Sequence, residues 1–244
     1  MDFLKLLKSF EEFVYEALLW LILVPKTLGR ILLRPRTMTT YASAQLATPD
    51  DRRFNEAISP PLLLILCVLI AQFIDLGVRA QVPASEGSMA SVLLASEQNL
   101  LLYRTVAFGI WALAGAVYFL VRSRVPINRE SLRAPFYEQC YLVCPFALLL
   151  SISLSMALIG EQGALLGAVL AIVGALWFWL VQAYWMRHKA GMSPWRSLVA
   201  GMIILLIGSL SNALLGQVLS RSHALPPSKP VAQVAGSVEG DRGR

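Results

Sequence analysis

The chain has 244 residues, of which 57% are hydrophobic and only 15% are charged. Soluble domains average about 45–50% apolar and about 25% charged residues, so the composition excludes an ordinary soluble domain. The net charge of +6 does not indicate nucleic-acid binding, because the basic residues lie mostly between apolar runs, where they set membrane topology. We therefore expect an integral membrane protein.

The first apolar segment, residues 2–24, has the pattern of an amphipathic helix. Apolar residues recur at steps of three and four from Phe3 to Leu21, and Lys5 and Lys8 lie on the other side. Its uninterrupted apolar part is too short to cross about 30 Å of hydrocarbon. We expect a helix in the bilayer interface, with a re-entrant segment as the alternative.

Five apolar stretches follow, and each is long enough to cross the bilayer. They cover residues 60–80, 103–122, 137–160, 163–186 and 195–219. The predicted fold class is therefore all-α, a polytopic bundle of about five spanning helices with an N-terminal interfacial helix.

The chain divides into three predicted parts. Residues 1–58 form a cytosolic or interfacial segment, in which residues 27–33 make a second short interfacial turn and the polar residues 35–58 follow the membrane surface. Residues 59–219 form the transmembrane domain. Residues 220–244, rich in Pro, Gly and Ser, are expected to be a flexible outer tail.

The orientation follows from the distribution of basic residues. Residues 1–58 hold eight Lys and Arg, and the loops at 122–133 and 187–196 are also basic, whereas residues 81–102 hold none. Basic segments stay in the cytoplasm. We expect a protein of the bacterial inner membrane, with a cytoplasmic N-terminus and a periplasmic C-terminus.

Polar side chains inside the spans are the candidate functional residues, because such groups are costly in a bilayer. They are Gln72, Asp75, Arg79, Ser151, Ser155, Gln182 and Asn212. They either line a polar path or hydrogen-bond between helices, and the packing interpretation is favoured. Asp75 and Arg79 are one helical turn apart near a helix end, where a local ion pair suffices to explain them.

Small residues at four-residue spacing predict close helix packing. They are Gly163, Gly167 and Ala171 in the fourth span, and Gly208 and Gly216 in the fifth. This spacing leaves open whether the contacts lie within one chain or between two copies.

Nothing in the sequence predicts catalysis, a metal or a cofactor. Cys140 and Cys144 share a helix face, but the two histidines, His188 and His223, lie in a loop or a tail, so metal ligands are lacking. No phosphate-binding glycine loop, zinc-protease motif or nucleophile elbow is present.

Three stretches resemble the Yip (Ypt-interacting protein) family, including its bacterial branch. They are RILLRPRTM at 30–38, ISPPLLLILCVL at 58–69 and APFYEQCYLVCPFALLL at 134–150. The resemblance implies a cytosolic N-terminal segment, five clustered spans and a short outer tail. Eukaryotic members act in vesicle trafficking and contact small GTPases, and some bacterial members carry labels such as permease. The N-terminal amphipathic helix departs from the family pattern.

The predicted function is a non-enzymatic membrane protein of Yip type that binds or organises a partner complex or lipids. The alternative is a permease or channel subunit with a path lined by the polar residues of the bundle. The expected partners are membrane lipids and either another membrane protein or a second copy of the chain, without nucleic acid.

Overall fold

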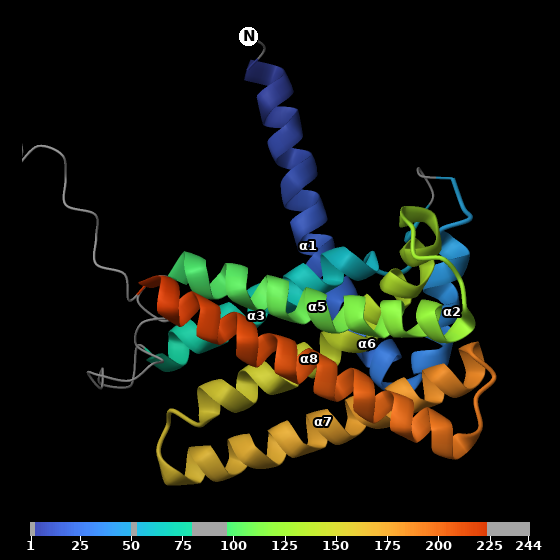
Figure 1. The fold of residues 1–244 in the computed structure, drawn as a ribbon. Coiled ribbons are helices and arrows are strands. Elements are labelled where there is room, and N and C mark those ends of the chain that lie inside the picture. Colours follow the sequence, from blue (N-terminus) through green and yellow to red (C-terminus); the bar gives the residue numbers. More distant parts are fainter. Residues whose placement is uncertain (1–2, 50–52, 80–96, 224–244) are drawn as a thin grey trace, which may run out of the picture.

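The computed structural model describes residues 3–49, 53–79 and 97–223. These residues form seven helices (Figure 1). In chain order they are α1 (Phe3–Leu33), α2 (Pro35–Gln45), α3 (Pro60–Arg79), α5 (Glu97–Ser123), α6 (Arg129–Met156), α7 (Glu161–Lys189) and α8 (Pro194–His223). Within these ranges, α3 and α5 to α8 are long and apolar enough to cross a membrane. The predicted all-α bundle of about five spans is confirmed.

The helix α6 lies at the centre of the bundle and packs against α1, α2, α3, α5 and α7. Its residues 140–144 are all fully buried. Because five consecutive residues point in every direction around a helix, neighbours must cover all sides of α6 at this level. Pro135 and Pro145 lie inside the helix, where neighbouring helices tolerate the lost backbone hydrogen bonds.

The helix boundaries differ from the boundaries of the predicted spans. The helix α6 begins eight residues before the predicted third span, because Asn128 caps it: Asn128 Oδ1 accepts hydrogen bonds from the backbone N–H groups of Glu130 and Ser131. The tight turn predicted near 160–163 lies at Gly160, whose φ of 97° favours glycine. At the other end, α8 continues to His223, into the predicted tail.

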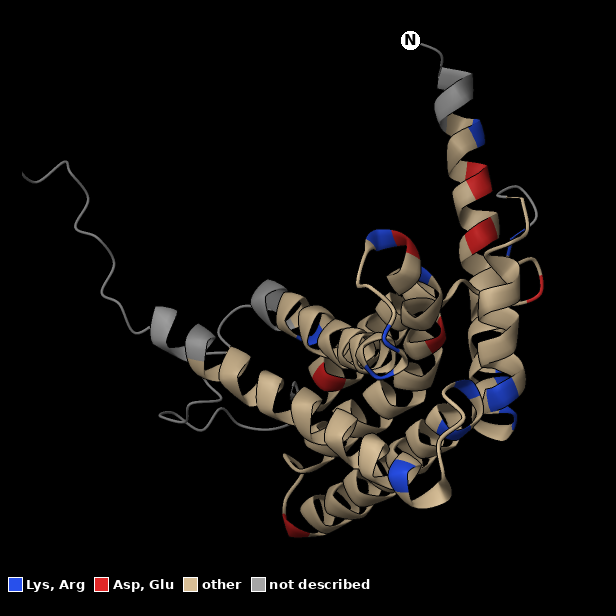
Figure 2. Cartoon of the chain, turned by 45° about the vertical axis from the view of Figure 1, so that its right-hand side comes forward, with Lys and Arg blue, Asp and Glu red and all other residues tan. Residues whose placement is uncertain are grey.

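The bundle has two chemically different ends. The ends of α5 and α7 and the starts of α6 and α8 meet at one of them, together with α2 (Figure 1). We call this the basic end, because it carries Arg122, Arg129, Arg133, Arg187, Lys189 and Arg196. Figure 2 shows the spans largely free of charged residues between their ends. The predicted outer loop, residues 81–102, lies mostly outside the described residues.

The helix α1 is one continuous helix through Pro25. The prediction of a separate short turn at 27–33 is therefore wrong. Val24, Thr27 and Ile31 are buried at spacings of three and four residues, so one face after Leu23 packs on the bundle and keeps the chain helical beyond the proline.

The segment after α1 also contains more regular structure than its sequence indicates. Residues 35–45 form α2, whose Met38, Thr39 and Ala42 are buried against α6. The sequence of this polar segment has no strong period, but a narrow face of three small or flexible side chains is enough to pack a short helix. Further on, Phe54 stacks on Tyr137 of α6 and holds the connection to α3.

Candidate functional site

A buried polar cluster joins α3, α5 and α6 at the end of the bundle opposite the basic end. Arg104 Nη2 lies 3.3 Å from Asp75 Oδ2, and Arg104 Nη1 donates to Gln72 Oε1 at 3.0 Å. Ser155 Oγ donates to Asp75 Oδ1 at 2.8 Å. Asp75 is only 1% exposed and Arg104 is 7% exposed. The ion pair is therefore buried between the helices and shielded from solvent.

This cluster brings together three of the seven predicted polar residues. Gln72, Asp75 and Ser155 meet there around Arg104, which was not among the residues singled out from the sequence. The predicted partner of Asp75, Arg79, has its side chain outside the described residues. Among the described side chains, the ion pair between Asp75 and Arg104 joins two helices and ties α3 to α5.

Two of the other predicted polar residues, Gln182 and Asn212, make separate contacts between helices. Gln182 of α7 exchanges two hydrogen bonds with Gln139 of α6, at 3.0 and 2.6 Å. Asn212 Nδ2 of α8 donates to Gly208 O at 2.9 Å and to Ala107 O of α5 at 3.4 Å. Ser151 supplies its carbonyl oxygen to Ser155 Oγ. Gln182 and Asn212 thus lie at two places apart from the Asp75 cluster, whereas Ser151 adjoins that cluster through Ser155.

The predicted small residues lie where helices approach closely. A Cβ atom added to Gly163 would come within 2.5 Å of Met156 O, and one added to Gly167 within 2.5 Å of Ser153 O. Ser153 Oγ also donates to Gly167 O at 2.6 Å. A Cβ on Gly208 would overlap the Trp111 indole of α5, while Gly216 leaves ordinary room beside Tyr103. Ala171 is half-buried in α7. These contacts lie within one chain.

The three cysteines are free and fully buried. Cys144 Sγ donates to the carbonyl oxygen of Cys140, one turn earlier. Among the described residues, no group of three or more His, Cys, Asp or Glu side chains is placed to hold a metal ion.

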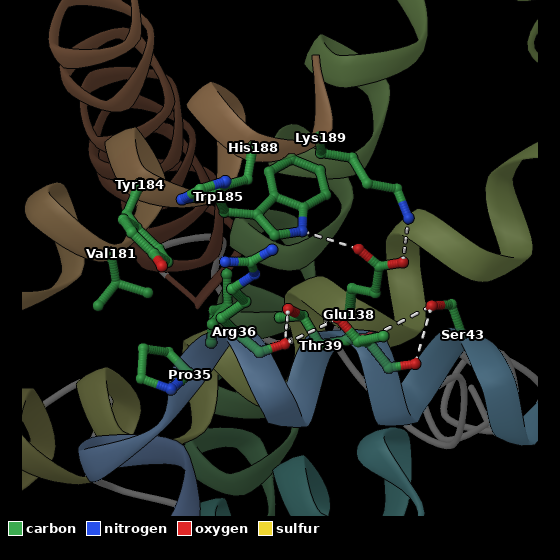
Figure 3. Close-up of a pocket in the computed structure, with 12 residues that line it drawn as sticks. Pro35, Arg36, Thr39, Ser43, Glu138, Val181, Tyr184, Trp185, His188 and Lys189 are labelled. Carbon is green, nitrogen blue, oxygen red and sulfur yellow. Dashed lines mark hydrogen bonds and ion pairs between the residues drawn. The ribbon is translucent and has the colours of Figure 1, made fainter. Parts of the chain in front are cut away.

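A cavity of about 210 Å³ lies at the basic end, between α2, α6 and α7 (Figure 3). At its floor, Glu138 is 1% exposed and accepts hydrogen bonds from Lys189 Nζ at 2.6 Å and from Trp185 Nε1 at 2.7 Å. Arg36 extends from α2 toward Tyr184 and the end of α7. Charged and aromatic groups from three helices therefore face one space.

Arg104, Glu138 and Gln139 were missed by reasoning from the sequence. Arg104 lies near the start of a predicted span, and Glu138 and Gln139 lie at the predicted start of another. A polar residue at a helix end has an ordinary explanation, so these positions do not stand out in the sequence. One signal in the sequence could have indicated the partner of Asp75. Asp75 lies near the end of one predicted span and Arg104 near the start of the next, so two adjacent antiparallel helices would place these opposite charges at matching depths.

The described contacts of these sites are hydrogen bonds, ion pairs and close helix packing. Every carboxylate inside the described part of the bundle, Asp75 and Glu138, is paired with a cation. The fold and the apolar spans define an integral membrane protein built as a helical bundle. Comparison with protein-family models, with curated proteins and with solved structures gives no match, and the Yip resemblance stays a prediction.

Proposed function

We propose that this chain is a non-enzymatic membrane protein that docks a partner membrane protein through α1. The observation that carries the proposal is the exposed apolar surface on the first two thirds of α1. This part of α1 stands out from the bundle and runs across the direction of α5 and α8 (Figures 1 and 2). That direction suits a helix lying along a bilayer surface.

A lipid surface alone does not account for this helix. Phe13 and Tyr15 are 61% and 64% exposed, yet residues two apart point to nearly opposite sides of an α-helix. An interfacial helix buries only one face, by about 5–10 Å, in the headgroup boundary. If one of these rings is in lipid, the other faces water unless a protein covers it, and exposed apolar patches of this kind are typical of interaction sites.

We also propose that the chain is a member of the Yip family and that it lies in the bacterial inner membrane. These two proposals rest on the three resembling stretches and on the basic residues that gather at one end of the bundle. In this orientation the basic end, α1 and α2 face the cytoplasm. The partner then meets α1 on the cytoplasmic side.

Photo-crosslinking tests the docking role of α1. With a photoreactive phenylalanine analogue at position 13 or 15, we expect at least one position to yield a discrete protein adduct in native membranes. The analogue at Glu12, on the charged side of the helix, is the control and should yield none. Deleting residues 2–24 should leave membrane insertion intact, because the five spans suffice for it, and should remove the partner from the purified protein.

Mass spectrometry of the adduct identifies the partner, and an adduct of two copies of this chain would make the protein a self-associating scaffold. Adducts to lipid alone at both positions would contradict the docking role. So would a truncated protein that still co-purifies with every partner.

Cysteine labelling tests the orientation. In a background with Cys67, Cys140 and Cys144 replaced by alanine, we introduce a single cysteine at Ile127 or at Glu161, which are both exposed. A membrane-impermeant maleimide added to intact spheroplasts should label position 161 and should label position 127 only after the membrane is opened. The reverse pattern would place the basic end outside.

A permease or channel subunit is the second candidate, and the convergence of Gln72, Asp75 and Ser155 favours it. However, Gln72 and Asp75 both contact Arg104, and Ser155 donates a hydrogen bond to Asp75. A conduit of this composition would need that ion pair to open during transport.

A further inference from the structure

The cavity between α2, α6 and α7 has an excess of positive charge. Arg36 and Lys189 carry two cations against the single carboxylate of Glu138. Because both Glu138 oxygens already accept hydrogen bonds from Lys189 and Trp185, the carboxylate is held at the floor. Within the part of the chain that the structure describes, Arg36 makes no ion pair.

Two cationic groups are among the hydrogen-bond donors that line the cavity. Thr39, Thr40 and Ser43 of α2 also line it, but their hydroxyl groups donate to backbone carbonyls of their own helix. The donors that remain are the guanidinium of Arg36, the ammonium of Lys189 and the side chains of Tyr184 and His188. Guanidinium and ammonium donors suit an anion, and the guanidinium fork matches two phosphate oxygens. The volume of about 210 Å³ is far above the roughly 10–15 Å³ that one water molecule requires.

The position of the cavity indicates a lipid as the source of that anion. It lies at the charged end of α7, where a spanning helix meets the headgroup region. One face of α7 that leads to the cavity carries four residues that are each about half exposed. They are Val173 (52%), Leu176 (49%), Leu180 (54%) and Tyr184 (41%). These residues are spaced by three or four positions and form one apolar stripe. Acyl chains of a lipid whose phosphate lies beside Arg36 would lie along this stripe.

We infer that this cavity binds the phosphodiester headgroup of one anionic phospholipid. Arg36 binds the phosphate from α2, Lys189 adds charge from α7, and the α7 stripe takes the acyl chains. Glu138 holds Lys189 and Trp185 in place and, by its negative charge, limits the cavity to an excess of about one positive charge. The site is independent of docking by α1, so the two proposals fail separately.

Native mass spectrometry of the full-length protein in detergent tests the site. The protein is titrated with phosphatidylglycerol or with phosphatidylcholine of the same acyl chains. Both lipids carry the phosphodiester, but the choline ammonium of phosphatidylcholine is repelled by the excess positive charge of the cavity. We therefore expect the first phosphatidylglycerol to bind roughly tenfold more tightly than phosphatidylcholine, the effect of one unfavourable charge interaction near a protein surface. Arg36→Gln should remove this preference. The matched control is Arg187→Gln, which removes the same charge from an exposed position of α7 outside the cavity and should change binding less than about twofold.

A second variant, Thr40→Glu, tests the cavity without changing Arg36. Thr40 is exposed at the cavity wall, so the substitution should not disturb folding, and its carboxylate should repel the phosphate and weaken phosphatidylglycerol binding. Inorganic phosphate in excess should not displace the lipid. Equal binding of the two lipids, equal effects of Arg36→Gln and Arg187→Gln, or displacement by inorganic phosphate would each overturn the assignment, the last in favour of a site for free phosphate.

Discussion

Replacing Asp75 with alanine is expected to destabilise the folded protein by about 3 kcal/mol or more, the usual effect of removing one partner from a buried ion pair. The carboxylate is 1% exposed and accepts from Ser155 while it faces the Arg104 guanidinium. Its removal leaves a buried guanidinium without that counter-charge. The measurement is unfolding of the purified protein in mixed micelles by a denaturing detergent.

The double variant Asp75→Leu with Arg104→Leu tests whether the loss comes from the broken pair. Replacing both partners by apolar residues removes the unpaired charge, so much of the stability should return. Glu161→Ala, which removes an exposed carboxylate at the same end of the bundle, is the control and should be close to neutral. Normal stability of Asp75→Ala would contradict a packing role. Loss of a transport activity in a fully stable Asp75→Asn protein would favour the permease alternative.

Gly208→Ala is expected to be the most disruptive small substitution in the bundle, with a loss of about 1–3 kcal/mol from overpacking. The added methyl group would overlap the indole of Trp111 on α5. That ring is 5% exposed and is held between Phe108, with ring centres 5.5 Å apart, and Phe146, with ring centres 5.0 Å apart. It has little freedom to move away, so α5 and α8 must separate. The same denaturing-detergent titration measures the loss.

Gly216→Ala provides the matched control, because it makes the same change in the same helix where the nearest atom, Tyr103 Oη, is 3.7 Å from the new Cβ. It should be nearly neutral. Combining Gly208→Ala with Trp111→Leu should recover part of the loss, since the smaller side chain makes room, and the double-mutant cycle measures that coupling. Equal stability of Gly208→Ala and Gly216→Ala would show that α5 and α8 do not pack as described.

The sequence predicts which polar residues inside the spans are candidates, but it does not predict their hydrogen-bond and ion-pair partners. Gln182 and Asp75 stand out in the sequence because polar groups are costly inside a bilayer. Their partners do not: Gln139 and Arg104 lie near helix ends, where a polar residue has an ordinary explanation. Only the antiparallel arrangement of the helices places Arg104 at the depth of Asp75. The small-residue spacing likewise predicts close approach, but Trp111 as the neighbour of Gly208 follows from the packing alone.

The N-terminal region shows where local patterns mislead. Pro25 and the following charges indicate a break in the helix, and residues 35–45 show no strong period. The structure contains a continuous α1 and a helical α2, because Ile31 and Ala42 are each fully buried. Burial of a few side chains outweighs weak local preferences, since helix stability in proteins comes largely from packing.

The sequence by itself determined that this protein is a membrane-spanning helical bundle, and where its five spans lie. Both follow from the length of apolar runs against the thickness of the bilayer, a property of each segment alone. Only the tertiary structure decided that α6 is the central helix, that Asp75 pairs with Arg104, and that Arg36 and Glu138 face one cavity. These depend on which helices are neighbours and at what depth, because side chains far apart in the chain meet only once the bundle has packed.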